Sequence, residues 1–184
     1  MTVLPEDDAV LVEQAKRNPD KFGAIYERYA HKIYTYIYYR TGNIHDAEDL
    51  TTNVFMRAMN HLPKYTDRGL PFSSWLYRIA HNLVSNWYRD QKRREIISLQ
   101  NSSVPENPSN NPVNIAASNE DTEMLLGVIR SLPPDRQELL ILKFVEKLSN
   151  KEIGLTMRRS EGAIKSLYHR TLISLRKNLK NGNR

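Results

Sequence analysis

The chain has 184 residues, enough for one domain or two small ones. Its 27 Lys and Arg against 21 Asp and Glu give a formal net charge of +6, which favours an anionic partner such as nucleic acid or an acidic membrane surface. The absence of cysteine excludes disulfides, thiolate metal ligands and a thiol nucleophile. The longest nearly apolar run, residues 33–39, is too short for a membrane span, and residues 6–8 are acidic where a signal peptide would be basic, so we expect a cytoplasmic protein.

The first half of the chain is predicted to be helical throughout. Asn18-Pro19 suits the start of a helix, in which apolar and aromatic residues then recur at steps of three and four. The six tyrosines from Tyr26 to Tyr39 are interpreted as core and rim residues of this helix. After a break at residues 41–43, a second helix begins with acidic residues, which its dipole favours. Its predicted apolar positions are Ala47, Leu50, Val54, Phe55, Ala58, Met59 and Leu62.

The next helix follows a loop bounded by Pro63, Gly69 and Pro71, and it combines aromatic with basic residues. Its apolar positions are Phe72, Trp75, Leu76, Ile79, Leu83 and Trp87, and its basic residues are Arg89, Lys92, Arg93 and Arg94. Aromatic rings that stack on bases beside cations that hold phosphates are typical of single-strand binding surfaces. Tyr77 and Tyr88 lie off the apolar stripe and are expected to be exposed; Trp75 is assigned to the core, and Trp87 fits either place.

A change of composition divides the chain into two lobes. Between Asn101 and Asn119, thirteen of nineteen residues are Asn, Ser or Pro. Such a segment buries too little apolar surface to offset the entropy lost on ordering. We therefore predict an all-α protein of two small helical domains, residues 1–94 and 122–184, joined by a flexible linker over residues 95–121.

The second lobe carries the pattern of a helix-turn-helix. It restarts with the apolar residues Met124, Leu125, Val128, Ile129 and Leu132, and after Pro133-Pro134 it continues with Leu139, Leu140, Leu142, Phe144 and Val145. Ser149 and Glu152 form a capping box that starts a short helix, and Ser160 can cap a long basic one over about residues 161–179. Two helices joined by a three-residue turn, the second of them basic, are typical of DNA-binding proteins, although an ordinary helical hairpin with a basic surface is the alternative.

An enzymatic or metal site has weaker support. His45, Asp46, Glu48 and Asp49 lie close together in sequence, but acidic residues are common in the first turn of a helix. The other histidines are scattered, and no phosphate-binding glycine motif occurs. We expect no catalytic residue, no metal and no cofactor.

Four segments resemble the sigma factors of bacterial RNA polymerase. Residues 46–55, Asp-Ala-Glu-Asp-Leu-Thr-Thr-Asn-Val-Phe, resemble their D-A-E-D-L-x-Q-E-x-F signature, and residues 72–83 resemble F-x-x-W-L-x-x-I-A-x-N-x. Residues 132–140 resemble the L-P-x-x-x-R/Q-x-x-L opening of their promoter-binding C-terminal domain. Residues 151–154 and 160–166 resemble E-I-A and S-x-G-T-V-K-S of its helix-turn-helix. The short length and the missing middle domain are similar to the extracytoplasmic-function (ECF) class of the sigma-70 family.

The resemblance implies a function for each lobe. The first lobe would bind the clamp of the largest polymerase subunit through Asp46, Glu48, Asp49, Leu50, Val54 and Phe55. It would open the −10 promoter element and hold its non-template strand through Lys64, Tyr65, Asn82, Ser85, Asn86, Trp87, Arg89, Lys92 and Arg93, with the loop 64–71 as the pocket for a flipped base. The second lobe would contact the flap of the second subunit and read the −35 element through Arg158, Arg159, Ser160, Glu161, Gly162, Lys165, Ser166, His169 and Arg170. The family also implies an anti-sigma partner.

Some positions depart from the family pattern. Thr52-Asn53 replaces Gln-Glu, and Asn86 stands where Asp is common. Arg158 stands where the turn usually has Gly, and Leu167 replaces a frequent Arg, which should weaken phosphate anchoring or alter the −35 preference. The rival hypotheses are a self-sufficient helix-turn-helix regulator and a metal or catalytic protein built on the cluster at residues 45–49.

Overall fold

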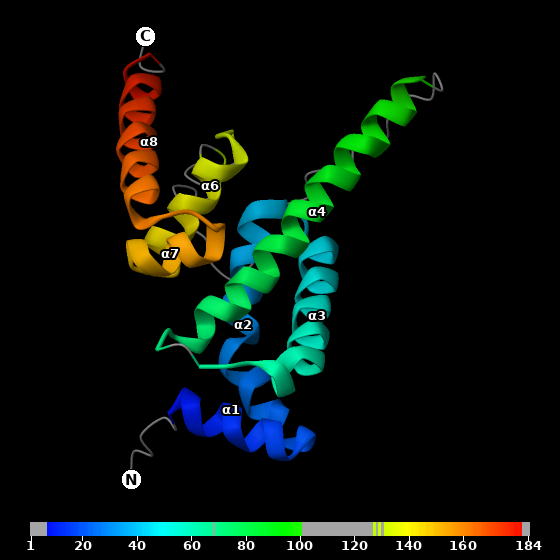
Figure 1. The fold of residues 1–184 in the computed structure, drawn as a ribbon. Coiled ribbons are helices and arrows are strands. Elements are labelled where there is room, and N and C mark those ends of the chain that lie inside the picture. Colours follow the sequence, from blue (N-terminus) through cyan, green and yellow to red (C-terminus); the bar gives the residue numbers. More distant parts are fainter. Residues whose placement is uncertain (1–6, 68, 101–126, 128, 130, 182–184) are drawn as a thin grey trace, which may run out of the picture.

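The computed structural model describes residues 7–67, 69–100, 127, 129 and 131–181. In this part of the chain the regular elements are all helical, which confirms the predicted all-α class (Figure 1). The first lobe contains α1 (Asp8–Arg17), α2 (Phe22–Thr41), α3 (Ile44–His61) and α4 (Phe72–Gln100), with the short turns η1 (Pro19–Lys21) and η2 (Leu62–Lys64). The second contains α6 (Pro134–Leu140), the π-helical turn η3 (Ile141–Val145), α7 (Asn150–Met157) and α8 (Glu161–Asn181). Within the described residues, no helix is both long enough and apolar enough to cross a bilayer.

Local capping explains where several helices begin and end. The Asn43 side chain accepts a hydrogen bond from the Asp46 amide at 3.1 Å and so starts α3. The predicted capping box at α7 is confirmed, because Ser149 and Glu152 each bond to the backbone of the other. Asn18 caps the short turn η1 rather than α2, which begins only at Phe22.

The hydrophobic core of the first lobe forms around α2, which packs against α1, α3 and α4. Its fully buried residues include Ile25, Ile33 and Ile37 of α2, Val54 and Ala58 of α3, and Leu76 and Val84 of α4. The second lobe is smaller and packs α6, α7 and α8 around Leu139, Ile141, Ile153 and Ile164. The short helix α7, the three-residue turn 158–160 and the long helix α8 form the helix-turn-helix that the sequence predicts.

The two lobes pack directly on each other. In Figure 1, α6, α7 and α8 lie on one side of α4, and α3 lies on the other. The contacts join α7 to α4 and α6 to α2. One predicted boundary is wrong: α4 continues to Gln100, so the helix extends into the segment that we assigned to the linker. Residues 101–126, which contain most of the predicted linker together with Met124 and Leu125, lie outside the described residues, as does Val128.

Several burial predictions fail where the lobes meet or where a helix face turns outward. Tyr77 was expected to be exposed, but only 2% of it is accessible, because the second lobe covers this face of α4. Met59 and Phe144, expected in the core, are 48% and 59% exposed. At Phe144 the reason is the π-helical turn, whose wider spacing shifts the register after Leu142 and turns the following side chains towards solvent.

Candidate nucleic-acid interface

The turn between α7 and α8 and the first part of α8 form a continuous exposed surface. All nine residues that the resemblance assigns to the −35 element are exposed there. They are Arg158, Arg159, Ser160, Glu161, Gly162, Lys165, Ser166, His169 and Arg170. Ser160 begins α8 by accepting a hydrogen bond from the Ala163 amide at 3.2 Å, and Lys165, His169 and Arg170 follow as exposed residues along the helix. The surface is thus an exposed helix start that carries several cations.

The tight turn before α8 depends on two residues with special backbone requirements. The Arg159 amide donates to the Gly154 carbonyl at 2.8 Å, and a Cβ atom on Gly154 would lie 2.6 Å from the Arg159 carbonyl oxygen. Only glycine therefore allows this close approach. Arg158 ends α7 in the left-handed conformation, with φ 55° and ψ 44°, where glycine is the common residue. The turn thus presents a cationic side chain at its corner at a cost of about 1 kcal/mol in backbone energy.

Ion pairs on this surface are exposed and exchangeable. Lys165 contacts Glu161 at 2.8 Å within α8, and Arg159 contacts Asp135 of α6 at 3.3 Å. The Lys165 ammonium lowers the pKa of the Glu161 carboxyl below its usual value. Exposed pairs of this kind contribute little to stability, so their cations can turn to phosphates at small cost.

Leu167 corrects one expectation about this helix. It is 3% exposed and packs in the lobe core, one turn after the fully buried Ile164. A residue on this inner face cannot anchor a phosphate, so the substitution of the frequent Arg removes no DNA contact here. The sequence-based interpretation of Leu167 as a lost phosphate anchor is wrong.

The residues assigned to the −10 element lie along α4 and in the loop before it. Asn86, Arg89, Lys92 and Arg93 are exposed, and Asn82, Ser85 and Trp87 are half-buried. Asn86 accepts a hydrogen bond from the Arg89 guanidinium, so the amide that replaces the family's Asp orients a cation. The Trp87 ring packs edge-on against Tyr88 with 4.9 Å between centroids, which leaves it at the rim between core and solvent.

A cavity of about 400 Å³ opens beside the loop at residues 64–71. Its walls combine two cations, two aromatic rings and a buried hydroxyl, together with one residue from the second lobe. They are Lys64, Tyr65, Thr66, Leu70, Pro71, Ser74, Trp75, Arg78 and Leu155. Tyr65 and Trp75 lie 5.0 Å apart between ring centroids, and the Ser74 hydroxyl finds no hydrogen-bond partner among the described residues. Rings, cations and a free hydroxyl are the groups that hold a base and its phosphate.

The helix α3 divides its predicted polymerase-binding residues between core and surface. Leu50, Val54 and Phe55 are buried against the rest of the lobe, so their side chains support α3 rather than face a partner. Glu48 and Asp49 are exposed, and Asp46 is partly buried. Met56, which is not among the predicted residues, is 59% exposed on the outer side of α3. Its position off the apolar stripe is the signal that could have identified it.

The acidic cluster at the start of α3 does not converge on a point. His45 lies 3.9 Å from Glu48, and both side chains are well exposed. Among the described residues, no group of three or more His, Asp or Glu side chains is arranged to hold a metal ion. Asp46 lies in the first turn of α3, where the dipole favours it, and Glu48 and Asp49 follow in the second turn.

Comparison with known proteins assigns both lobes to one family. Residues 25–94 match the family described as Sigma-70 region 2, and residues 122–175 match Sigma-70, region 4. The chain is 31% identical over 182 residues to the ECF RNA polymerase sigma factor SigW of Bacillus subtilis, covering 92% of this chain and 95% of SigW. It is 34% identical over 166 residues to the ECF RNA polymerase sigma factor BldN of Streptomyces coelicolor, covering 90% of this chain but only 63% of BldN. Among solved structures, the sigma factor RpoE of Bartonella quintana, in complex with the anti-sigma factor NepR, has a TM-score of 0.67 at 19% identity and covers 86% of this chain and 96% of that one.

Proposed function

Since the chain belongs to the ECF class of sigma-70 family RNA polymerase sigma factors, we propose that its two lobes divide promoter recognition between them. Residues 1–94 bind core polymerase and the −10 element, residues 122–184 read the −35 element, and residues 95–121 connect them, with α4 continuing into this connection to Gln100. The observation that carries this proposal is the exposure of all nine predicted −35 residues on one surface of the helix-turn-helix.

The second lobe recognises the −35 element as duplex DNA. The first turns of α8 enter the major groove, where Lys165, Ser166 and His169 reach base edges or the adjoining backbone. Arg158, Arg159 and Arg170 contact phosphates, which set the register of the helix on the DNA. The lack of acidic side chains other than Glu161 from residue 158 to the C-terminus keeps this surface attractive to DNA.

The first lobe opens and holds the −10 element. Flipping a base out of the stack costs a few kcal/mol, which contacts to the flipped base must offset. The cavity beside residues 64–71 supplies aromatic walls from Tyr65 and Trp75 and a free hydroxyl from Ser74. Further along α4, Arg89, Lys92 and Arg93 hold the backbone of the separated strand.

Polymerase binding uses the outer side of α3. Glu48 and Asp49 present charge there, and Met56 and Met59 present 59% and 48% exposed apolar side chains beside them. Exposed large apolar residues next to charges are typical of a protein interface. This surface meets the clamp of the largest subunit, the second lobe meets the flap of the second subunit, and an anti-sigma partner binds the chain, as NepR binds the Bartonella factor.

The protein acts without chemistry of its own. It gives core polymerase its promoter specificity in the cytoplasm. It holds no cofactor, since the aromatic rings, cations and amides of its functional surfaces serve to bind partners.

Run-off transcription tests this function. Core bacterial RNA polymerase is assayed on a panel of upstream sequences from the host, with and without the protein. Specific transcripts that require both components are expected. Tight binding to duplex DNA alone, with neither core binding nor transcripts, would instead identify a self-sufficient helix-turn-helix regulator.

A further inference from the structure

The two lobes meet along one face of α4, which borders the cavity at residues 64–71 and lies next to the −10 residues. Leu155 of α7 closes one wall of the cavity formed by Trp75 and Arg78. Further along, His81 and Tyr88 contact residues of α6. Ser85, assigned to the −10 strand, lies between His81 and Tyr88 on the same helical face, because residues three and four apart are neighbours on a helix. The second lobe therefore covers the side of α4 that borders the cavity and holds Ser85, whereas Asn86, Arg89, Lys92 and Arg93 stay exposed.

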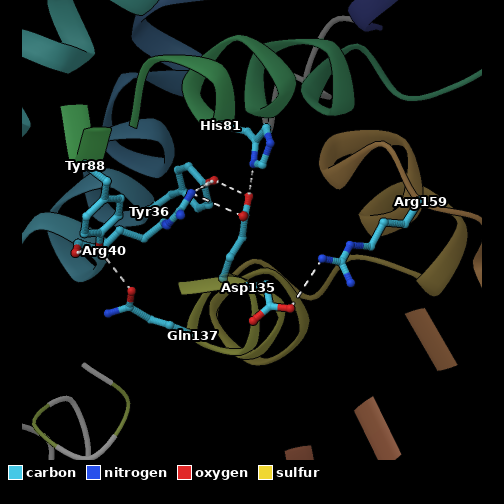
Figure 2. A network of polar contacts seen from close by, with 8 residues as sticks. Tyr36, Arg40, His81, Tyr88, Asp135, Gln137 and Arg159 are labelled. Atoms are coloured by element: carbon cyan, nitrogen blue, oxygen red, sulfur yellow. Dashed lines mark hydrogen bonds and ion pairs between the residues drawn. The ribbon is translucent and has the colours of Figure 1, made fainter. Parts of the chain in front are cut away.

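A buried carboxylate holds the lobes in this arrangement. Glu138 of α6 accepts hydrogen bonds from the Tyr36 hydroxyl at 2.6 Å and from His81 Nδ1 at 2.7 Å. An ionised carboxylate only accepts, so Nδ1 of His81 carries the proton. Arg40 approaches the other carboxylate oxygen at 3.3 Å and donates to the Tyr36 hydroxyl at 2.9 Å. Figure 2 shows Tyr36 and Arg40 of α2 and His81 of α4 converging on this one side chain.

The charge at Glu138 is stabilised only while the lobes are together. Burial by itself disfavours the carboxylate, but Arg40, His81 and Tyr36 outweigh that cost and lower the pKa of Glu138 below its usual value. Arg40 is itself 4% exposed, and Glu138 is its closest carboxylate in the described structure. Burying either partner alone would cost free energy, so the pair stabilises this one arrangement of the lobes. We call Glu138, with its partners, the lock.

A second polar contact lies one turn along α4 from His81. The Tyr77 hydroxyl donates to the Glu146 carboxylate, just after η3. The Tyr77 ring also packs edge-on against Tyr36, with 5.5 Å between centroids, and so links the two contacts through one aromatic pair. These contacts explain why Tyr77 is buried although it lies off the apolar stripe of α4.

The other functional surfaces stay open in this arrangement. The nine residues of the −35 surface are exposed, and so are Met56 and Met59 on the outer side of α3. In Figure 1, α3 lies across α4 from α7, and α8 extends away from the first lobe. Of the three proposed surfaces, closure therefore restricts the −10 surface, at its cavity and at the side that holds Ser85.

We propose that the free chain holds itself closed, with its own α6–α7 segment seated against the cavity and the Ser85 side of the −10 surface, and with Glu138 as the lock. This inference rests on the proposed function of the −10 surface. Because residues 101–126 join the lobes covalently, closure is intramolecular and needs only a modest affinity between them. Promoter opening then requires the second lobe to leave α4, while the polymerase-binding and −35 surfaces remain accessible beforehand.

Distances between two spin labels test the closed state in the full chain. The protein has no cysteine, so the substitutions Ala24→Cys and Ile173→Cys create unique labelling sites at exposed positions of α2 and α8. We expect one narrow distance distribution for the free protein and a shifted one after core polymerase and promoter DNA are added. A broad distribution in the free protein would overturn the proposal.

Substitutions at the lock sharpen the test. Glu138→Gln keeps the size of the side chain but leaves Arg40 without its counter-ion, and we expect the ratio of open to closed chains to rise about 100-fold. Asp135→Asn is the matched control, because it removes an acid from the same helix whose partner, Arg159, belongs to its own lobe (Figure 2). It should leave the distances unchanged.

A second, milder variant keeps the test decisive if Glu138→Gln does not fold. Tyr77→Phe keeps the ring in place and removes only the hydrogen bond to Glu146, which should shift the same ratio about fivefold. A folded Glu138→Gln protein that stays as closed as the wild type would show that Glu138 is not the lock. Run-off transcription by the same labelled protein separates the two proposals. If the free chain is open and transcripts form, the proposed function stands and the closed state is rejected. If the free chain is closed and no transcripts form, the closed state stands and the proposed function is rejected.

Discussion

Arg40 of α2 and Glu138 of α6 form an ion pair at 3.3 Å between the two lobes, and each side chain is 2% exposed. Arg159 and Asp135 form a pair at the same distance, but both are more than a third exposed and belong to one lobe. The two pairs share geometry and differ in burial. Desolvation makes a buried partner costly when it stands alone, whereas water solvates an exposed one.

Double-mutant cycles should therefore separate these pairs. Arg40→Met or Glu138→Leu alone should destabilise the protein by about 3 kcal/mol, and the double variant should be near neutral, which gives a large coupling energy. The cycle built from Arg159→Ala and Asp135→Ala should give less than about 1 kcal/mol. Urea unfolding of each variant measures these free energies. Equal coupling in both cycles would contradict the role of burial.

The closed state should depend on pH with opposite signs at two carboxyl groups. The pKa of Glu138 is lowered in the closed form from its ordinary value of 4.5, so its stabilisation is present above pH 4.5 and is lost as the pH falls through the lowered pKa. Burial raises the pKa of Glu146 above 4.5, although Tyr77, Lys32 and His31 oppose this, so its ionised form weakens closure as the pH rises through the raised pKa.

Label distances recorded between pH 3 and pH 8 measure both effects. Glu146→Gln should raise the closed fraction at neutral pH and leave a single opening transition on the acid side of about pH 4.5. In Glu138→Gln that acid transition should disappear. An unchanged acid transition in Glu138→Gln would assign the pH dependence to another group.

Two cationic residues hold left-handed backbone, and comparing them separates strain from DNA binding. Arg158 has φ 55° and Lys147 has φ 56°. Replacing either with Gly should relieve the strain and stabilise the protein by up to about 1 kcal/mol. Only Arg158→Gly should also weaken transcription from promoters that need the −35 element, because Lys147 lies outside the proposed DNA surface. Thermal unfolding and run-off transcription of both variants provide the measurements; equal transcription would remove Arg158 from the DNA interface.

The close backbone contact between Gly154 and Arg159 in the helix-turn-helix should leave no room for a methyl group on residue 154. In Gly154→Ala the new Cβ would meet the Arg159 carbonyl oxygen at 2.6 Å, which forces the turn to move. We expect a loss of about 2 kcal/mol, in the range of overpacked sites. Gly23→Ala is the control, since a Cβ there has open space and the site is helical, so it should stabilise by up to about 1 kcal/mol. Urea unfolding distinguishes them, and a neutral Gly154→Ala would mean that the turn adjusts freely.

The parts of the fold that the sequence predicts correctly depend on local signals. The capping box at Ser149 and Glu152 sets the start of α7 through bonds within four residues. The exposed surface of α8 follows from the capping residue Ser160 and the helical repeat, since both are properties of one segment. Such signals need no knowledge of what packs on the helix.

The predictions that fail depend on contacts between segments far apart in the chain. Tyr77 lies off the apolar stripe of α4, and its burial comes from Glu146, 69 residues later. No sequence signal marks Glu138, which pairs with Arg40 across 98 positions, from 40 to 138. Leu167 was interpreted by alignment with a motif, and only the packing of α8 reveals its inward direction. Periodicity identifies the helix face that packs inside its own lobe. It does not reveal a second face of the same helix that another lobe covers.

Removing the ring of Trp87 should separate promoter opening from duplex binding. Trp87 is half-buried beside Tyr88 on the proposed single-strand surface, and a lost base stack costs about 1–3 kcal/mol. Trp87→Ala should therefore reduce permanganate reactivity of the −10 thymines at least fivefold, with little change in closed-complex binding. Lys165→Ala should do the opposite, weakening duplex binding at the −35 element, and Lys21→Ala, an exposed charge on η1, should change neither. Wild-type permanganate reactivity in Trp87→Ala would exclude this ring from strand separation.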